Sequence, residues 1–178
     1  MTKKIPHAEL LAKHPLEIGA SNPILRTKCD EVISFDASLR ELASDMQKLQ
    51  RIHHGTGLAA PQIGQPIQMA TTIQRKKKWN KMAEIGETVL VNPTITFKSD
   101  ELFVSEESCL SLPDFVGYVQ RHKRVTVAYQ DLMGQKKTKE FSDYNAAVVQ
   151  HEIDHLHGVL FIDKLVPAPK EYKKAKRG

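Results

Sequence analysis

The sequence QHEIDH at residues 150–155 constrains this chain more than any other stretch. On an α-helix, His151 and His155 lie one turn apart on the same face, so two imidazoles can bind one metal ion. Glu152 follows the first histidine, where its carboxylate can reach a water bound to that ion and act as a general base. The pattern predicts a metal site on a helix. The simpler interpretation is a polar helix face that happens to carry two histidines.

A catalytic metal site needs a third protein ligand and one open position. The zinc-protease pattern HExxHxxGxxH is matched through Gly158, but Phe161 stands where the last histidine belongs. The side chains that remain as downstream candidates are His157, Asp163 and Glu171. His157 is only two positions past His155 and points away from that helix face. An upstream residue, Cys109 in the sequence ESCLS, is the best candidate.

Composition excludes several classes of protein. The chain has 178 residues, 40% of them hydrophobic, which suits one folded domain and excludes a disordered protein. It has no apolar run long enough for a membrane span and no secretory signal, so we expect neither a membrane partner nor secretion. The two cysteines, Cys29 and Cys109, are too few for a disulfide framework. We therefore expect the cytosol or a comparable reducing compartment, with Cys29 as a structural or free thiol.

The formal net charge of +5 comes largely from two basic clusters, at residues 75–78 and 170–177. Because no nucleic-acid motif accompanies them, we expect no specific DNA binding. A basic tail of this kind is usually a solvated chain end, although it also suggests an RNA-binding module as an alternative function.

Two long helices are predicted. Asp36 is a suitable N-cap for a helix to about His54, with apolar side chains at three- and four-residue spacing. The other helix runs from Ser142 or Asp143 to His157 and ends at a glycine. Short strands are expected at residues 67–73, 88–91, 94–97, 101–104, 116–119, 124–130 and 137–141, with an exposed loop at 76–87. Strands grouped between two helices, without βαβ alternation, predict an α+β fold.

Residues 55–64, GTGLAAPQIG, form a segment with little side-chain bulk, which lets a ligand backbone come close to the protein backbone. Gln62 carries an amide donor that can face developing negative charge. The simpler alternative is a glycine-rich turn into a strand. His53 and His54, just before this segment, are interpreted as a solvated helix end.

Three segments in this order resemble the signatures of the peptide deformylase family. The family patterns are GΦGΦAAxQ, EGCΦS and QHExDH, where Φ is aliphatic, and this chain has GTGLAAPQ, ESCLS and QHEIDH. The resemblance spans residues 22–161. It implies antiparallel β-sheets packed around a C-terminal metal-binding helix, with a second long helix nearer the N-terminus. It also implies an N-terminal extension at residues 1–20, a catalytic domain at 21–167 and a basic tail at 168–178.

The resemblance implies that one divalent metal is bound by Cys109, His151 and His155. Fe(II) is expected, and Zn(II), Ni(II) or Co(II) can replace it. A metal-bound hydroxide would attack the formyl carbon of an N-formylmethionyl peptide and release formate. Glu152 would act as general acid and base, and the Gln62 side chain and the Leu110 backbone N–H would stabilise the oxyanion.

The same resemblance implies an extended substrate that pairs beside Gly57, with a methionine pocket near several further residues. These residues are Thr56, Glu107, Leu110, Tyr144, Ala147 and Val148. Ala147 and Val148 are equally well interpreted as core residues of the helix. The partners are nascent N-formylmethionyl peptides, and the basic tail suggests a weak contact with the ribosome.

The chain departs from the family patterns at Thr56, where an aliphatic residue is usual, and at Ser108, where glycine is usual. If position 108 needed a positive φ, serine would be strained; if the glycine only allows close approach, Ser108 alters the pocket rim. The alternative functions are a zinc endopeptidase and a non-catalytic relative that binds ribosomes or peptides.

Overall fold

A computed structural model describes residues 7–78 and 81–169 of the chain. The helices are α1 (His7–Lys13), α2 (Ala37–Ile52) and α3 (Asp143–Leu156). The strands are β1 (Gly57–Ala59), β2 (Met69–Lys78), β3 (Lys81–Lys98), β4 (Leu102–Cys109), β5 (Leu112–His122), β6 (Arg124–Gln130), β7 (Lys136–Ser142) and β8 (Leu165–Val166). Three 3-10 turns lie at Pro23–Arg26, Ala60–Ile63 and Phe161–Lys164. Within the described ranges, no helix is long and apolar enough to cross a membrane.

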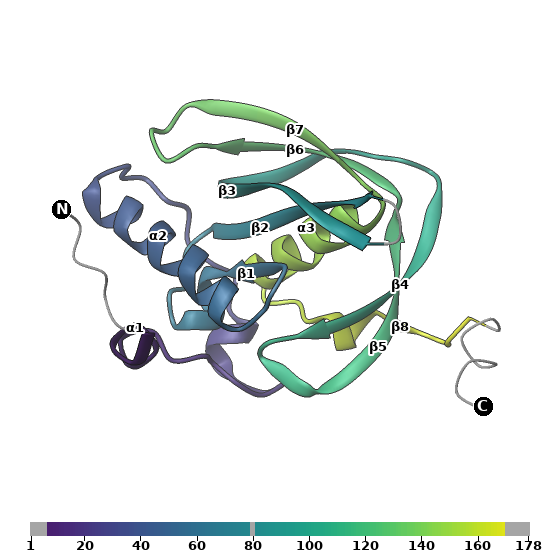
Figure 1. Cartoon of the computed structure of the whole chain (residues 1–178), viewed down its shortest axis with the longest axis horizontal. Coiled ribbons are helices and arrows are strands. Elements are labelled where there is room, and N and C mark those ends of the chain that lie inside the picture. The colour runs from purple at the N-terminus through teal and green to yellow at the C-terminus, as the bar shows by residue number, and fades with distance from the viewer. Residues whose placement is uncertain (1–6, 79–80, 170–178) are drawn as a thin grey trace.

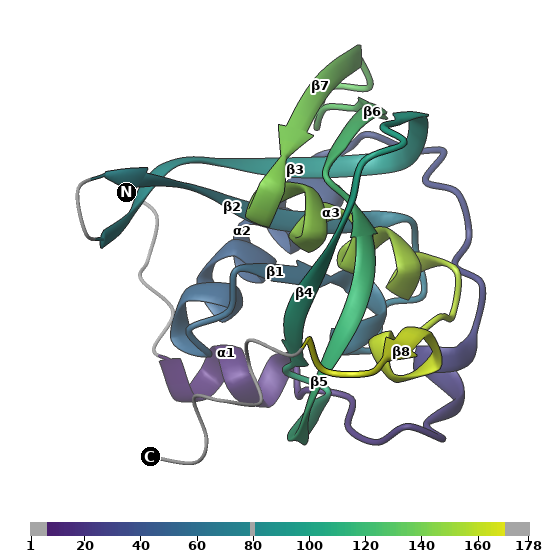
Figure 2. The ribbon, with the colours of Figure 1, turned by 90° about the vertical axis from the view of Figure 1, so that its right-hand side faces the viewer.

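The strands form two antiparallel sheets with α3 between them (Figures 1 and 2). The larger sheet has five strands in the order β1-β2-β3-β6-β7, and the smaller has three in the order β4-β5-β8. Leu90 packs with α3 residues and its neighbour Val91 with α2 residues. Because successive side chains of a strand point to opposite faces, α2 and α3 cover opposite faces of the larger sheet. The predicted α+β class is confirmed.

Helix α2 begins where its sequence predicts. The Asp36 carboxylate accepts hydrogen bonds from the backbone N–H groups of Ser38 at 2.8 Å and Leu39 at 3.2 Å, as an N-cap does. The apolar stripe of α2, which is Leu39, Ala43, Met46 and Leu49, is buried in the core with β1 and β2. The second predicted helix is also present as α3.

Helix α3 ends at Leu156 and is followed by Gly158, whose φ of +71° favours glycine. A Cβ added there would lie 2.4 Å from the Arg26 backbone oxygen, so the helix end is packed directly against the chain that precedes α2. This contact fixes the C-terminal end of the helix that carries both motif histidines.

The predicted exposed loop at residues 76–87 is wrong. Strand β2 continues to Lys78, strand β3 starts at Lys81, and β2 pairs over its whole length with residues 81–91 of β3, with a register shift after Gln74. Residues 88–91 and 94–97, predicted as separate strands, both belong to β3. Asn92, with φ +50°, only shifts the register there. A two-stranded arm therefore extends from the larger sheet (Figure 2).

The described N-terminal residues pack onto the body of the protein. Leu10 of α1 is 1% exposed and joins the core against α2, and Lys13 forms an ion pair with the buried Asp45 at 2.9 Å. The division into an extension, a catalytic domain and a tail stays a prediction, and residues 170–178 of that tail lie outside the described residues.

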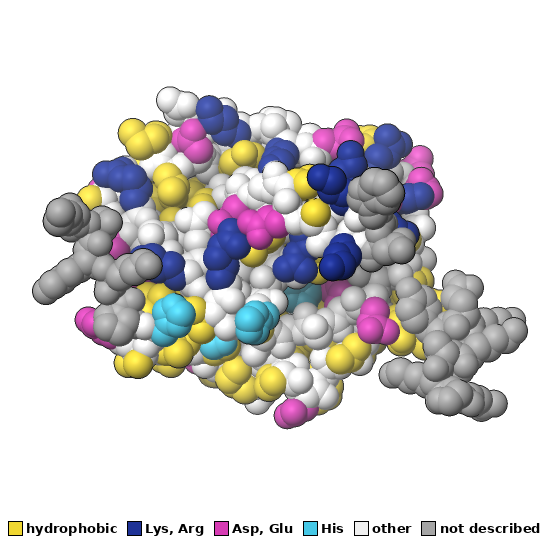
Figure 3. Space-filling view, viewed as in Figure 1, with side chains coloured by type: hydrophobic (Ala, Val, Ile, Leu, Met, Phe, Trp, Pro, Cys, Tyr) yellow, Lys and Arg dark blue, Asp and Glu magenta, His cyan; other side chains and the backbone are white. Residues whose placement is uncertain are grey.

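Charged side chains of both signs share the surface of the larger sheet. On the face in Figure 3, lysine and arginine side chains gather over the upper half, and acidic side chains lie among them. Arg51, for example, pairs with Glu84 at 2.8 Å and with Glu87 at 2.9 Å. This mixture does not favour the RNA-binding alternative, because a polyanion is bound by a field of one sign.

Candidate metal centre

Strand β4 turns alternate side chains toward helix α3. Ser105, Glu107 and Cys109 are buried, whereas the residues between them are exposed. This alternation brings the thiol of Cys109 to 3.3 Å from Nε2 of His155. The donor atoms of Cys109, His151 and His155 all lie within 4.8 Å of one another.

These three residues fit a single divalent metal ion. With metal–ligand bonds of about 2.0–2.3 Å, tetrahedral ligands lie roughly 3.5 Å apart, close to the observed separation of sulfur and nitrogen. A thiolate with two imidazoles favours Fe(II), Zn(II), Ni(II) or Co(II) over Mg(II) and Ca(II). The chemistry of the donor set and its geometry therefore agree.

The downstream candidates for the third ligand do not reach this site. Asp163 pairs with Arg26, with 2.5 Å between oxygen and nitrogen. His157 is exposed, and its Nδ1 lies 2.8 Å from the Ile153 carbonyl oxygen. Glu171 lies outside the described residues. Phe161 is buried and stacks on His151, with 6.0 Å between ring centroids.

A buried ion network orients His151. Its Nδ1 lies 2.9 Å from Oε2 of Glu107, and Arg121 donates to both Glu107 oxygens, at 2.7 and 2.9 Å. Arg121 also donates to Asp154 at 2.5 Å, and Lys164 donates to the other Asp154 oxygen at 2.7 Å. A ligand histidine held in this way keeps one ring orientation and one tautomer.

The network also sets the pKa values around the site. Burial raises the pKa of Glu107, but hydrogen bonds to Arg121 and His151 and the charges of these two residues together outweigh it, so the pKa is lowered and the carboxylate stays charged. Burial lowers the pKa of His151, but hydrogen bonds to Cys109 and Glu107 outweigh it and raise the pKa to about 10. Burial lowers the pKa of His155. A metal ion competes with the His151 proton, because a ligand imidazole must be neutral.

Glu152 lines the same cavity as Cys109 and His151. Its side chain is buried, and Oε2 has no hydrogen-bond partner among the residues that the structure describes. Burial raises its pKa to about 7, near the value that suits a general base and acid at neutral pH. A Cβ on Gly57 would lie 2.1 Å from Oε1 of Glu152, so only glycine at this position lets the carboxylate stand where it does.

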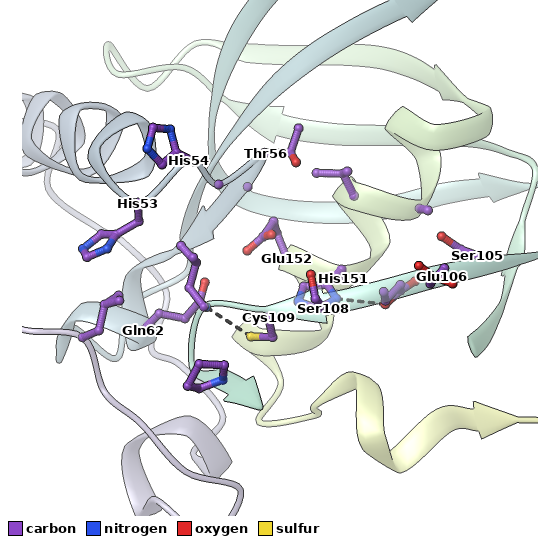
Figure 4. Close-up of a pocket in the computed structure, with 18 of the residues that line it drawn as sticks. His53, His54, Thr56, Gln62, Ser105, Glu106, Ser108, Cys109, His151 and Glu152 are labelled. Atoms are coloured by element: carbon purple, nitrogen blue, oxygen red, sulfur yellow. Dashed lines mark hydrogen bonds and ion pairs between the residues drawn. The ribbon is translucent and has the colours of Figure 1, made fainter. Parts of the chain in front are cut away.

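Gln62 connects the glycine-rich segment to the thiol (Figure 4). Its Oε1 accepts a hydrogen bond from the Ala59 backbone N–H at 2.8 Å. Its Nε2 donates to Oγ of Ser111 at 3.2 Å and to Sγ of Cys109 at 3.4 Å. The backbone therefore fixes one end of the amide and turns its N–H groups toward the ligands.

A cavity of about 610 Å³ opens onto Cys109, His151 and Glu152. It is lined by every residue that the family resemblance implies for substrate binding, namely Thr56, Gly57, Glu107, Leu110, Tyr144, Ala147 and Val148. Thr56 and Tyr144 hydrogen-bond to each other across it, with 2.8 Å between their oxygens. Ser108 also lines the cavity and is exposed, and its φ is not positive, so the strained alternative for this serine does not apply.

Other lining residues are absent from the sequence-based prediction. His53 and His54, predicted as a solvated helix end, line the cavity, and His53 is half-buried (Figure 4). Ser105, which also lines the cavity, is missed too, and so is Arg121, which is not a lining residue but donates to Glu107. Two-residue alternation from Glu107 points to Ser105, whereas Arg121 has no local signal because only the fold brings it to Glu107.

The fold and the site together have the features of a metal-dependent hydrolase: a cysteine and two histidines that fit one metal ion, with a buried glutamate beside them.

Comparisons with known proteins give the family. Residues 17–171 match the family model of polypeptide deformylase. The peptide deformylase of Pseudothermotoga lettingae is 39% identical over 151 residues, 85% of this chain and 82% of the relative. That of Brucella suis is 42% identical over 144 residues, 81% of this chain and 80% of the relative.

Solved structures agree. The crystal structure of peptide deformylase from Thermotoga maritima matches with a TM-score of 0.77 at 34% identity, over 86% of this chain and 98% of that one. The Met-Ala-Ser-bound class I type b peptide deformylase of Acinetobacter baumannii matches with a TM-score of 0.79 at 31% identity, over 85% and 98% of the two chains. The chain belongs to the peptide deformylase family.

Proposed function

We propose that this site removes the formyl group from the N-formylmethionyl termini of newly made proteins and releases formate. The observation that carries this proposal is the convergence of Cys109 with His151 and His155, with the Glu152 carboxylate buried beside them. A relative with Met-Ala-Ser bound supports a peptide that begins with methionine as the product.

A divalent cation bound by the three ligands would supply a Lewis acid that acidifies water and polarises the formyl oxygen. Glu152, with its pKa near 7, would take the proton of the attacking water and pass it to the leaving amine. The Gln62 amide and the Leu110 backbone N–H would stabilise the negative oxygen of the tetrahedral intermediate. Removing one such donor costs about 100- to 1000-fold in kcat, which is the effect we expect for Gln62→Leu.

The substrate would lie extended along the cavity. Its backbone would pair beside Gly57 and the end of β4, and its methionine side chain would enter between Thr56, Tyr144 and the small residues of α3. The cavity is open in the described structure, which counts against a non-catalytic relative. The cysteine ligand, with Phe161 in place of a third histidine, counts against an endopeptidase.

The metal we propose is Fe(II), because the thiolate ligand and the family favour it, with Zn(II), Ni(II) or Co(II) as substitutes. The reaction would take place where formylated chains are made, in a bacterial-type cytoplasm or an organellar matrix. The weak ribosome contact proposed for the basic tail is tested by removing residues 170–178. Unchanged co-sedimentation with ribosomes would eliminate that contact.

The function is tested by formate release from formyl-Met-Ala-Ser with anaerobically purified protein. We expect turnover by the wild type, a loss of about 100-fold or more in Glu152→Gln with the metal retained, and no change in Glu101→Gln, an exposed matched control. Cleavage of an internal peptide bond without formate release would show an endopeptidase instead.

A further inference from the structure

The cavity extends past the metal ligands as a trough between β4 and α3. On β4, Ser105 lies two and four residues before Glu107 and Cys109, on the same buried side. Each two-residue step covers about 6–7 Å along a strand. On α3, Tyr144 and Ala147 lie about two turns and one turn before His151. Figure 4 shows Ser105 on the far side of His151 from His53 and His54, so the trough runs away from the ligands toward Ser105.

This trough has hydroxyl groups in its walls. The Ser105 side chain is 8% exposed, lines the cavity, and has no hydrogen-bond partner in the described parts of the chain. Thr56 and Tyr144 use one hydroxyl proton for the bond between them. Two hydroxyls carry two protons, so one proton of this pair remains to be donated. The trough therefore offers two donors to a group that enters it.

The buried carboxylate on the same face of β4, Glu107, is already occupied. Both oxygens of Glu107 accept hydrogen bonds from Arg121, and one of them also lies 2.9 Å from the His151 ring. Ala147 of α3, which also lines the cavity, has only a methyl side chain, so it takes up little of the space on the helix side. A polar acceptor in the trough would therefore meet hydroxyl donors that Glu107 does not use, beside a small side chain of the helix.

An ordinary methionine cannot use these donors well, because its thioether sulfur is a weak acceptor. Oxidation to the sulfoxide leaves the carbon chain unchanged and adds a strong S=O acceptor on the sulfur atom, so the oxygen lies about as deep in the pocket as the sulfur. An apolar pocket would leave that oxygen without a hydrogen bond and would reject it. A pocket with free hydroxyls satisfies it.

We propose that this chain also deformylates N-formyl peptides that begin with methionine sulfoxide, with Ser105 and the Thr56–Tyr144 pair as the residues that accept the sulfoxide. This inference rests on the proposed function, because it adds a substrate class to the same site. Of these residues, Ser105 sets the specificity most directly, since its hydroxyl is committed to no other group.

The test compares kcat/KM for formyl-Met-Ala-Ser with kcat/KM for each of the two sulfoxide epimers of that peptide. We expect the better epimer to be hydrolysed within about tenfold of methionine by the wild type. We expect Ser105→Ala to lower the sulfoxide-to-methionine ratio by about fivefold or more, the scale of one lost hydrogen bond. The double variant Thr56→Val/Tyr144→Phe should lower it as well. Thr138→Val, an exposed control on β7, should leave the ratio unchanged.

A sulfoxide-to-methionine ratio of kcat/KM below one tenth for both epimers in the wild type would overturn the proposal. The proposal would also fail if this ratio were the same in the wild type and in both trough variants, Ser105→Ala and Thr56→Val/Tyr144→Phe. The dissociation constants of the products Met-Ala-Ser and Met(O)-Ala-Ser provide a second readout. The preference for the sulfoxide product should be lower in the trough variants than in the wild type and the same in the Thr138→Val control. Failure to hydrolyse formyl-Met-Ala-Ser would refute the proposed function instead, and product binding would still test the trough.

Discussion

Replacing Arg121 by methionine tests the ion network that orients His151. The Arg121 side chain is 3% exposed and donates to Glu107 at 2.7 and 2.9 Å and to Asp154 at 2.5 Å. Methionine fills a similar space but removes the cation that donates to both Glu107 oxygens, and leaves the His151 ring at 2.9 Å as the positive charge beside Glu107 in the metal-free protein. Removing one partner of a buried pair costs about 3–5 kcal/mol when the remaining charge is uncompensated, and the partial compensation by His151 places this variant at the lower end of that range.

The expected cost is therefore about 3 kcal/mol or more in the free energy of unfolding, measured by urea titration of the metal-free protein. Metal affinity, measured by competition with a chelator, should also fall by about 10- to 100-fold, since Glu107 would no longer hold the His151 ring as firmly. The double variant Arg121→Met/Glu107→Gln should be less destabilised than the sum of the two single variants, because it removes the buried charge.

The matched control is Lys123→Met, which breaks an ion pair of similar length but high exposure. The Lys123 and Glu101 side chains are 40% and 58% exposed and lie 2.6 Å apart. Such a pair contributes about 0–1 kcal/mol. If Arg121→Met cost no more stability than Lys123→Met and left metal affinity unchanged, the reasoning about the network would be refuted.

Three further predictions concern single residues. In Gly57→Ala, the new Cβ would displace the Glu152 carboxylate, so formate release should fall by about 100-fold or more while metal content stays the same; full activity would show that the carboxylate needs no such clearance. Ser108→Gly should be as active as the wild type or more so, because Ser108 is an unstrained residue at the cavity rim; a sharply less active variant would give the serine a positive role. Burial raises the pKa of Asp45, but hydrogen bonds from its two lysine partners outweigh it and lower the pKa below 3.8. The ionised form thus stabilises the fold at neutral pH, and this contribution is lost as the pH falls through the lowered pKa. Asp45→Asn should therefore lower the urea midpoint at pH 7 and progressively less below pH 4; an equal difference at every pH would contradict it.

Local sequence signals predicted the helices because the interactions that define them are local. Asp36 caps the residues that directly follow it, and the apolar stripe of α2 repeats within one helix. The arm formed by the end of β2 and the start of β3 was missed for the opposite reason. Residues 76–78, 81 and 82 are exposed, so the arm has no buried face and no apolar alternation to indicate strands.

The metal centre was only partly predictable from the residues themselves. The spacing of His151 and His155 fixes two ligands on one helix face, but four side chains remained open for the third. The choice of Cys109 depends on the packing of β4 against α3, which the family resemblance implied and the structure shows. Arg121 acts through contacts far apart in the sequence, and nothing near it predicts them.

The ligand set is tested most directly by the X-ray absorption spectrum of the metal-loaded protein. We predict one sulfur at about 2.3 Å and two imidazole nitrogens at about 2.0–2.1 Å from the ion. A spectrum without the sulfur shell, or one that is unchanged in Cys109→Ala, would contradict the assignment of Cys109, His151 and His155 as the metal ligands.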